Sequence, residues 1–434
     1  MSSQGTHSPP RIRVIWSPPP DPNKPECPYL PGFIFNVSEH EPPPPFGPGG
    51  GSGAYPPSRL PVFSNEWLRT TPQTQQVLQR PPEETQWPSA SLPRTAIFTI
   101  NHAITIGNAR GAQVVAGYMT EQGQEWPHLV TAKIFDSLYY PSVDDLANVP
   151  SSATYWAEKD YSRESAAYRH LEADEARQKP GFAPKYYGSW TFELPLSSQG
   201  KTHTRRVRLI LIEYLDGSSM LDLFAKNSSG PMAGRDAFHY NLDYRLSIFA
   251  ELLDGVQRQE HSGLDQVDLS PRNVIIVPSP KKTTLPPGQS PRVVLVDYNI
   301  SVVFSQTKYA PMYKQAGDRP INPAQQFWTL PPDDFGGWIP AEWYDDTDDN
   351  SSYHEWLLSN FGGENASHYE PLVIEERKRT EVEAHDGSDD ENFDWDAYYE
   401  LTGIRRAPRY IDSPSPAREA SLEPLQSELS PSGQ

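Results

Sequence analysis

Runs of proline and glycine near the start of the chain limit where regular structure can form. Several of the 47 prolines fall in clusters at 18–20 and 42–45, and a glycine-rich stretch follows them. Proline lacks the backbone donor that helices and sheets require, and glycine-rich chain behaves as a flexible linker. We therefore expect residues 1–94 to be a disordered Pro/Gly-rich arm. Two apolar islands within it, 33–35 and 67–68, are able to dock on a folded domain.

Charge sets the corresponding limit at the C-terminal end. The sequence becomes strongly charged from about residue 376 and includes the acidic run 385–392, which cannot form a core. We expect residues 376–434 to be an acidic disordered tail. Aromatic residues between Phe393 and Tyr399 interrupt the acids, and a stretch of this kind also suits binding to a groove on a partner.

Composition excludes several classes of protein. A hydrophobic content of 36% over 434 residues is enough for one large core or two ordinary ones. The net charge of -19 argues against nucleic acid and anionic membrane as partners. The single cysteine, Cys27, excludes an intramolecular disulfide and a cysteine-based metal cluster. Without a long apolar run, we expect a soluble monomer inside the cell, cytoplasmic or nuclear.

Alternating apolar residues predict a β-hairpin at the start of the foldable region. Residues 96–106 and 113–118 have the pattern of two strands. The turn between them contains Gly107 and Gly111, and an ordinary hairpin turn explains these glycines as well as a binding role does.

Two charged residues occupy positions that the apolar pattern predicts to be buried. Lys133 lies within the apolar strand 128–136, where its ammonium group needs an anion. Residues 155–175 have helical periodicity and place Glu164 on the apolar face of the helix. We expect these two side chains to pair. The alternatives are an edge-strand lysine and a helix-surface glutamate that both face water.

The segment after the long amphipathic helix 240–261 carries three oxygen-bearing side chains. Asp268 and Asn273 precede the apolar run 274–277, and a second apolar run leads into Asp297. Groups placed in this way can meet at one polyphosphate, where an aspartate orients the attacking hydroxyl and other oxygens hold divalent cations. The alternative is a turn between two buried strands, because Asp, Ser, Pro and Asn are common turn residues.

The order of these residues resembles that of the protein-kinase-like superfamily, and in particular of fungal kinase-like proteins with a D-L-x-P-R-N loop. The loop from Asp268 to Asn273 reads D-L-S-P-R-N, and Asp297 opens D-Y-N where the family has D-F-G. The resemblance covers the part between the two arms. It implies an α+β, two-lobed protein-kinase-like fold with disordered termini. The N-lobe would span 95–216 and a reduced C-lobe 217–375.

The resemblance also implies ATP and Mg²⁺ as cofactors. Lys133 would contact the phosphates and pair with Glu164, and Lys133 and Asp268 would be the catalytic residues. Asn273 and Asp297 would bind the magnesium ions.

The family binds the rest of the nucleotide mainly through backbone groups. Gly107 and Gly111 lie where kinases have their phosphate-covering loop. Glu213 and Leu215 follow the apolar strand 207–212 and lie where the hinge between the lobes binds adenine.

The implied reaction is ATP- and Mg²⁺-dependent phosphoryl transfer to a hydroxyl, with protein serine or threonine as the acceptor. Gln266 and Val267 replace the His-Arg of most protein kinases, and Ser270 replaces a lysine of the serine/threonine kinases. Two alternatives follow. One is a small-molecule phosphotransferase of the aminoglycoside type, and the other is a pseudokinase that acts as a nucleotide-binding scaffold.

Overall fold

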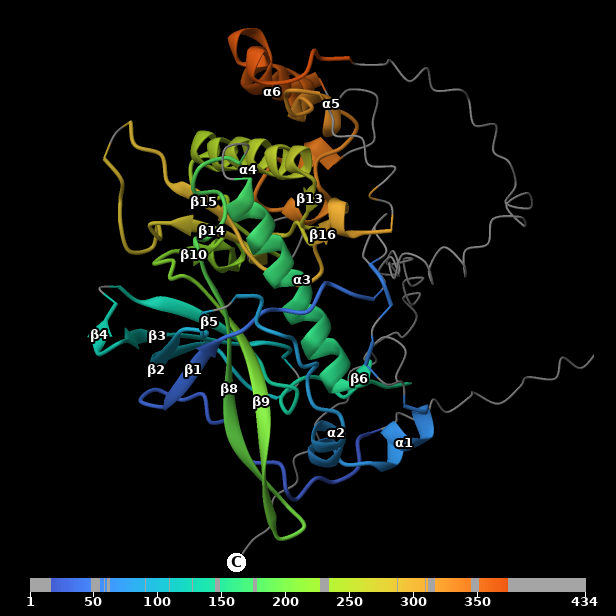
Figure 1. Cartoon of the computed structure of the whole chain (residues 1–434). Helices are drawn as coiled ribbons and strands as arrows, with labels where there is room; N and C mark the ends of the chain where they lie inside the picture. Colours follow the sequence, from blue (N-terminus) through green and yellow to red (C-terminus); the bar gives the residue numbers. More distant parts are fainter. Residues whose placement is uncertain are drawn as a thin grey trace, which may run out of the picture.

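A closed antiparallel β-barrel forms the N-terminal half of the molecule (Figure 1). Around the barrel the strands follow the order β2 (Thr95–Thr105), β1 (Ile34–Glu39), β8 (Tyr186–Ser198), β9 (Lys201–Glu213), β5 (Val130–Phe135) and β3 (Gln113–Glu121). Pairing of β3 with β2 completes the circle, and β4 (Gln124–Glu125) pairs with the end of β3. The computed structural model describes residues 17–47, 55–57, 59–60, 63–89, 91–108, 110–126, 128–144, 149–174, 178–226, 234–286, 288–308, 310, 317–344 and 351–373.

The barrel strands bury one face inside the barrel and turn the other outward, because side chains along a strand alternate. In β5, Ala132 and Ile134 are fully buried in the interior, together with Trp190 of β8 and Leu209 of β9. Phe135 points the other way and belongs to the core outside the barrel. Helix α3 (Ala153–Ala173) packs on this outer face, where it contacts β5, β8 and β9.

The expected two-lobed protein-kinase-like fold is wrong. The sheet of the first half closes into an antiparallel barrel, which is not the architecture of a typical two-lobed kinase. The strand that closes it is β1, which pairs with β2 on one side and with β8 on the other. Its alternation of buried Phe35 and Val37 with outward Ile34 and Asn36 is that of a half-buried strand.

The N-terminal arm was expected to be disordered, and this is wrong for its described residues. Besides β1, the arm forms α1 (Asn65–Thr70) and α2 (Gln73–Gln79). Tyr29 is fully buried, and its hydroxyl donates to Asp136 Oδ2 at 2.6 Å. The guanidinium of Arg163 donates to the Phe46 carbonyl from a buried position on α3. Prolines limit the length of each element here without preventing packing. The predicted acidic tail, 376–434, lies outside the described residues.

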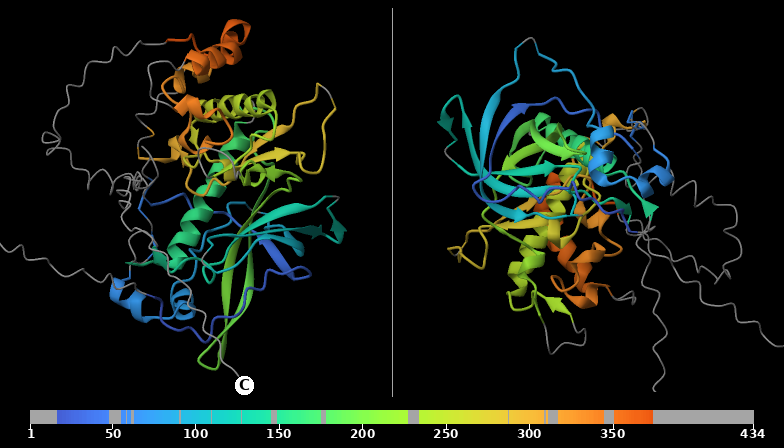
Figure 2. Two further views of the ribbon diagram at one scale, coloured as in Figure 1. Left: turned by 180° about the vertical axis from the view of Figure 1, so that it is seen from behind. Right: turned by 90° about the horizontal axis from the view of Figure 1, so that it is seen from below.

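The second half is built on α4 (Leu242–Ser262) and reaches the barrel through α3, which spans both halves (Figures 1 and 2). Asn241 caps the start of α4 through its side chain, and Gly263 ends the helix in a left-handed conformation with φ of 95°. The predicted helices 155–175 and 240–261 are confirmed to within a few residues, as is the strand 274–277, which is β14 (Val274–Val277).

The remaining elements are short. The strands are β6 (Val143–Asp144), β7 (Val149–Pro150), β10 (Ser218–Ser219), β11 (Ala225–Lys226), β12 (Arg235–Asp236), β13 (Leu264–Asp265), β15 (Arg292–Leu295) and β16 (Val302–Val303). The α-helices are α5 (Pro323–Gln326) and α6 (Ser351–Phe361), and 3₁₀ turns occur at Leu221–Leu223, Pro271–Asn273, Phe304–Gln306, Asp333–Phe335, Ala341–Tyr344 and Gly363–His368. Among the described residues, no helix is both long enough and apolar enough to cross a membrane.

Candidate functional site

The candidate site centres on Lys133, which bridges two carboxylates from different parts of the molecule. Its Nζ lies 2.5 Å from Glu164 Oε2 on α3 and 2.5 Å from Asp297 Oδ1, beyond the end of β15. The side chain of Glu164 is 1% exposed and that of Lys133 is 11% exposed, whereas that of Asp297 is 37% exposed. The predicted pairing of Lys133 with Glu164 is therefore confirmed, and Asp297 is the member of the group that solvent or a ligand can reach.

The position of Lys133 follows from the barrel. Lys133 pairs with Ile210 of β9 and Val114 of β3, and its neighbours Ala132 and Ile134 fill the interior. Lys133 must therefore point outward, toward α3 and the second half. An ammonium group there, in an apolar layer, is stable only because Glu164 and Asp297 neutralise it.

Burial and charge act in opposite directions on this cluster. Burial alone lowers the pKa of Lys133, but the carboxylates of Asp297 and Glu164 outweigh it and hold that pKa above its usual value. Burial raises the pKa of Glu164 to about 7, against the opposing effect of Lys133. The two carboxylates thus favour the charged form of the lysine, while burial disfavours the charged form of Glu164.

A third acid, Asp160, lies beside the cluster and was missed in the sequence. Its Oδ2 accepts from the Tyr140 hydroxyl at 3.3 Å and from Asn299 Nδ2 at 3.4 Å. Burial raises its pKa to about 6. The available signal was its spacing, because a residue four positions before Glu164 lies on the same helix face.

The loop residues Asp268 and Asn273 also lie together. Asn273 Nδ2 donates to the backbone carbonyl and to Oδ2 of Asp268, both at 2.9 Å. Arg272 Nη2 donates to Asp268 Oδ1 at 2.6 Å. Asn273 is buried, whereas the Asp268 side chain is 23% exposed. The loop thus presents one accessible carboxylate, that of Asp268, which the side chains of Asn273 and Arg272 hold in place.

Three hydrogen bonds, one from the backbone and two from the Gln266 side chain, join this loop to Val296 and Asp297. The backbone N–H of Val296 donates to the Asn273 carbonyl at 2.9 Å. Gln266 Nε2 donates to the carbonyl of Asp297 at 2.9 Å and to that of Val296 at 3.2 Å. Asp297 has a positive φ of 66°, which is costly for a residue with a side chain unless its surroundings fix it. In the sequence Gln266 was only a departure from the family pattern; here it positions Asp297.

The residues proposed to bind magnesium fit that ion. Lys133 contacts Oδ1 of Asp297, and in the described part of the chain no hydrogen bond reaches its Oδ2. The amide nitrogen of Asn273 faces Asp268, so its side-chain oxygen is the atom left for a cation. Mg²⁺ typically takes one or two protein oxygens and completes its shell with phosphate and water. The described residues contain no cluster of three or more His, Cys, Asp or Glu side chains suited to a metal held by protein alone.

The two glycines considered for phosphate binding belong to the turn between β2 and β3. Gly107 and Gly111 both have positive φ, and the buried Gln113 side chain holds the turn. Gln113 accepts from the Gly107 N–H at 2.6 Å and donates to the carbonyls of Gly107 and Gly111. The Gly107 amide is therefore already engaged. Gly111 faces Tyr140, which connects the turn to Asp160.

Glu213 is the last residue of β9, and Leu215 follows it. The Glu213 carboxylate forms a two-pronged ion pair with Arg292 of β15 at 2.6 and 2.9 Å and accepts from the Lys185 N–H. The Leu215 carbonyl accepts from the Gly217 N–H at 2.8 Å. The side chain of Glu213 therefore has a structural role, and any contact with a nucleotide would use the backbone.

Comparisons with known proteins give no family: no protein-family model matches the chain, and no curated protein matches it significantly. The chemistry of the site is therefore inferred from its own residues.

Proposed function

We propose that this protein transfers a phosphoryl group from ATP to a hydroxyl in a magnesium-dependent reaction. The observation that carries the proposal is the bridge of Lys133 between Glu164 and Asp297, with Asp297 linked through the backbone to the Asp268–Asn273 loop. Phosphoryl transfer needs a cation and carboxylates at one site. Here the cation is the buried Lys133, and the accessible carboxylates are those of Asp297 and Asp268. The proposal keeps the resemblance of these motifs to the protein-kinase-like superfamily but not the fold of that superfamily.

Each residue has a distinct role in this proposal. Lys133 binds phosphate oxygens, and Glu164 keeps its ammonium in place from the buried side. Asp297 and Asn273 hold Mg²⁺, which would neutralise charge on the transferred group. Asp268 accepts the proton of the acceptor hydroxyl or orients that hydroxyl. The proposed acceptor is a protein serine or threonine, with a small-molecule hydroxyl as the alternative.

A second candidate is nucleotide binding without transfer. The ion pair between Arg272 and Asp268 at 2.6 Å favours it, because it occupies the carboxylate that a general base needs. For transfer to occur, Arg272 must leave Asp268. Its side chain is 58% exposed, so water can replace the pair at little cost.

Thermal unfolding with ATP, with and without Mg²⁺, tests the proposal, followed by transfer from labelled ATP into a mixed extract of proteins and metabolites. At a ligand concentration one hundred times Kd, binding should stabilise the parent by about 2.7 kcal/mol. Asp297→Asn should lose the magnesium-dependent part of this shift. Asp268→Asn should keep it and lose transfer by about a hundredfold to ten-thousandfold.

Asp333→Asn, an exposed acid in a turn of the second half, is the matched control. No shift at millimolar ATP in the parent would remove both candidates. A shift without transfer in the parent would leave the binding module.

A further inference from the structure

A cavity of about 300 Å³ lies where α3 and β8 meet the second half of the molecule. It is lined by the C-terminal part of α3, by residues 178–186, which lead from α3 into β8, by Gln259 of α4 and by Arg292 of β15. Its volume is at the lower end of the range for small-molecule sites, which occur preferentially at junctions between structural units. None of the described residues that line it belongs to the Lys133 cluster.

Two buried side chains from different helices line the cavity with polar atoms that lack a partner. These atoms are the Tyr168 hydroxyl and Gln259 Oε1, and among the described residues neither has a hydrogen-bond partner. Tyr168 is 1% exposed and Gln259 is 2% exposed. A buried polar atom without a partner costs free energy, and a bound molecule that bonds to both atoms removes this cost.

The bonds of Tyr298 determine which atom of Gln259 is left for a ligand. The Tyr298 hydroxyl donates to the Leu295 carbonyl at 3.3 Å, so its oxygen accepts from Gln259 Nε2 at 2.8 Å. Gln259 Oε1 therefore remains as an acceptor that needs an N–H or O–H group. The Tyr168 hydroxyl is able to donate or to accept.

A second amide lines the cavity from the segment after α3. Both Nε2 and Oε1 of Gln178 are buried, and neither has a partner in the described part of the chain. An amide of this kind pairs best with a group that offers a donor and an acceptor side by side, as a carboxamide or the edge of a nucleobase does. The same groups also supply the donor that Gln259 needs.

The walls of the cavity are largely aromatic and fixed in position. Tyr168 and Tyr186 stack in parallel with ring centroids 5.6 Å apart, and Phe182 is buried. The Phe182 carbonyl accepts from a backbone N–H of β15 at 2.7 Å, and Arg292 donates to the Gly181 carbonyl at 2.6 Å. A flat ring suits this lining, and these bonds hold the segment in place before a ligand binds.

The charges around the cavity do not favour an ionic ligand. Arg292 pairs with Glu213, and Lys179 pairs with an aspartate of α4. The two other charged residues of the lining, Lys185 and Glu172, carry opposite charges. Because these charges cancel, a neutral molecule fits the lining best.

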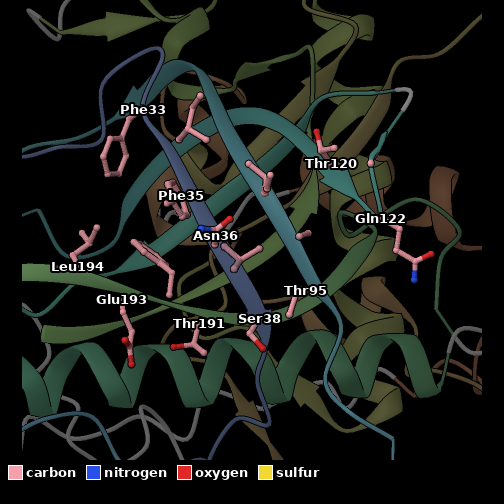
Figure 3. Close-up of a pocket in the computed structure, with 16 residues that line it drawn as sticks. Phe33, Phe35, Asn36, Ser38, Thr95, Thr120, Gln122, Thr191, Glu193 and Leu194 are labelled. Carbon is pink, nitrogen blue, oxygen red and sulfur yellow. The ribbon is translucent and has the colours of Figure 1, made fainter.

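A wider cavity of about 930 Å³ beside β1 shows the contrast (Figure 3). Phe35 and Phe192 in its lining already stack on each other, with ring centroids 4.2 Å apart. Among the described residues that line it, no buried side-chain polar atom lacks a partner. That cavity therefore does not select a ligand by its chemistry.

We propose that the cavity between α3, α4 and β15 binds a small, neutral, planar molecule with an amide group or the equivalent edge of a nucleobase. An N–H of the ligand donates to Gln259 Oε1, and its donor–acceptor edge pairs with Gln178. The Tyr168 hydroxyl bonds to the same edge, and the ring lies against Phe182 and Tyr186. This site does not depend on the phosphoryl-transfer chemistry.

Titration of the full-length protein with benzamide, followed by ligand-observed NMR, tests the proposal. Methyl benzoate is the matched control ligand, because it keeps the ring and the carbonyl but has no N–H. Benzamide should bind at least about tenfold more tightly, since methyl benzoate leaves Gln259 Oε1 without a donor. Cytosine, titrated in parallel, distinguishes a nucleobase from a simple carboxamide as the preferred ligand.

Two results of these titrations would overturn the proposal. Equal affinities for benzamide and methyl benzoate would show that the amide is not recognised. Failure of both benzamide and cytosine to bind at millimolar concentration would show that the cavity takes up water only.

Substitutions in the lining test whether the ligand binds in this cavity. Tyr168→Phe removes a hydroxyl that has no partner among the described residues, so the fold should persist while the affinity for benzamide falls about threefold to tenfold. Gln178→Ala should have a similar effect. Tyr118→Phe, on β3 and outside this lining, is the matched control and should bind benzamide like the parent.

Thermal unfolding of each variant without ligand checks that it is folded. Unchanged affinity in both lining variants, or an equal loss in Tyr118→Phe, would place the binding elsewhere and overturn the proposed site.

Discussion

Among the described residues, two buried ion pairs link a barrel strand to helix α3, and one of them belongs to the candidate site. Lys133 of β5 pairs with Glu164, and Arg208 of β9 pairs with Glu158 at 3.8 Å. Both glutamates are buried, and burial raises the pKa of each to about 7. The two ion pairs differ in the other groups that Lys133 and Arg208 contact.

The other donors of Arg208 bind groups of the barrel and of the N-terminal arm. It donates to Thr191 Oγ1 at 2.8 Å and to the Glu83 carbonyl at 2.8 Å, and its side chain is almost fully buried. Lys133 instead reaches the accessible Asp297 of the second half. A buried glutamate with a raised pKa therefore does not by itself mark a functional site. What marks the site is a buried cation that also holds an accessible carboxylate.

The largest expected difference between the two pairs concerns activity. Lys133→Met should reduce the proposed phosphoryl transfer by about a hundredfold to a thousandfold, because it removes a cation that would stabilise developing charge. Arg208→Met should leave the rate per folded molecule unchanged. Rates are measured at saturating ATP, with the folded fraction determined on the same samples. An equal loss in both variants would show that the two pairs do not differ in function.

The free energy of unfolding should instead depend strongly on the pair between Arg208 and Glu158. Arg208→Met leaves Glu158 buried without its cation and should destabilise the fold by about 3 kcal/mol. The double variant Arg208→Met/Glu158→Gln should recover part of this loss, because the uncompensated charge is gone. Urea unfolding of the parent, single and double variants measures both effects. Destabilisation of the double variant beyond the single one would show that Glu158 contributes through other contacts.

The two glutamates should give similar pH dependence. Each has a folded-state pKa raised from 4.5 to about 7, so the folded state binds more protons than the unfolded state between these values. Their contribution to the free energy of unfolding therefore falls as the pH rises from about 4.5 to about 7. Glu164→Gln and Glu158→Gln should each flatten this decline, measured by unfolding at several pH values. A steeper decline in either variant would reverse the assigned sign.

The smallest effect is expected at the exposed ion pair between Arg272 and Asp268. Arg272→Ala removes its contact with Asp268 and should change the free energy of unfolding by less than about 0.5 kcal/mol, because such pairs are screened by water. Thermal unfolding measures this directly. A loss comparable to that of Arg208→Met would show that Arg272 supports the loop fold.

The local pattern of the sequence predicted the elements that carry the site, but not their arrangement. Glu164 on a helix and Lys133 in a strand were predictable because apolar periodicity placed each on a buried face. Barrel closure was not predictable, because it depends on β1, a six-residue strand between proline-rich segments. The roles of Gln266 and Gln113 were equally hidden, since each side chain acts through hydrogen bonds to backbone groups, which leave no pattern in the sequence.

The two-pair ladder between β1 and β8, which closes the barrel, also bears on how the chain folds. Ser38 and Thr191 pair across about 150 residues of sequence, so β1 emerges from the ribosome long before its partner β8 exists. Until then its edge toward β8 is available to other strands, including those of neighbouring nascent chains. Once β8 has been made, Pro195 removes a donor from the part of its edge beyond Thr191, where the ladder with β1 has ended, and so weakens mispairing there.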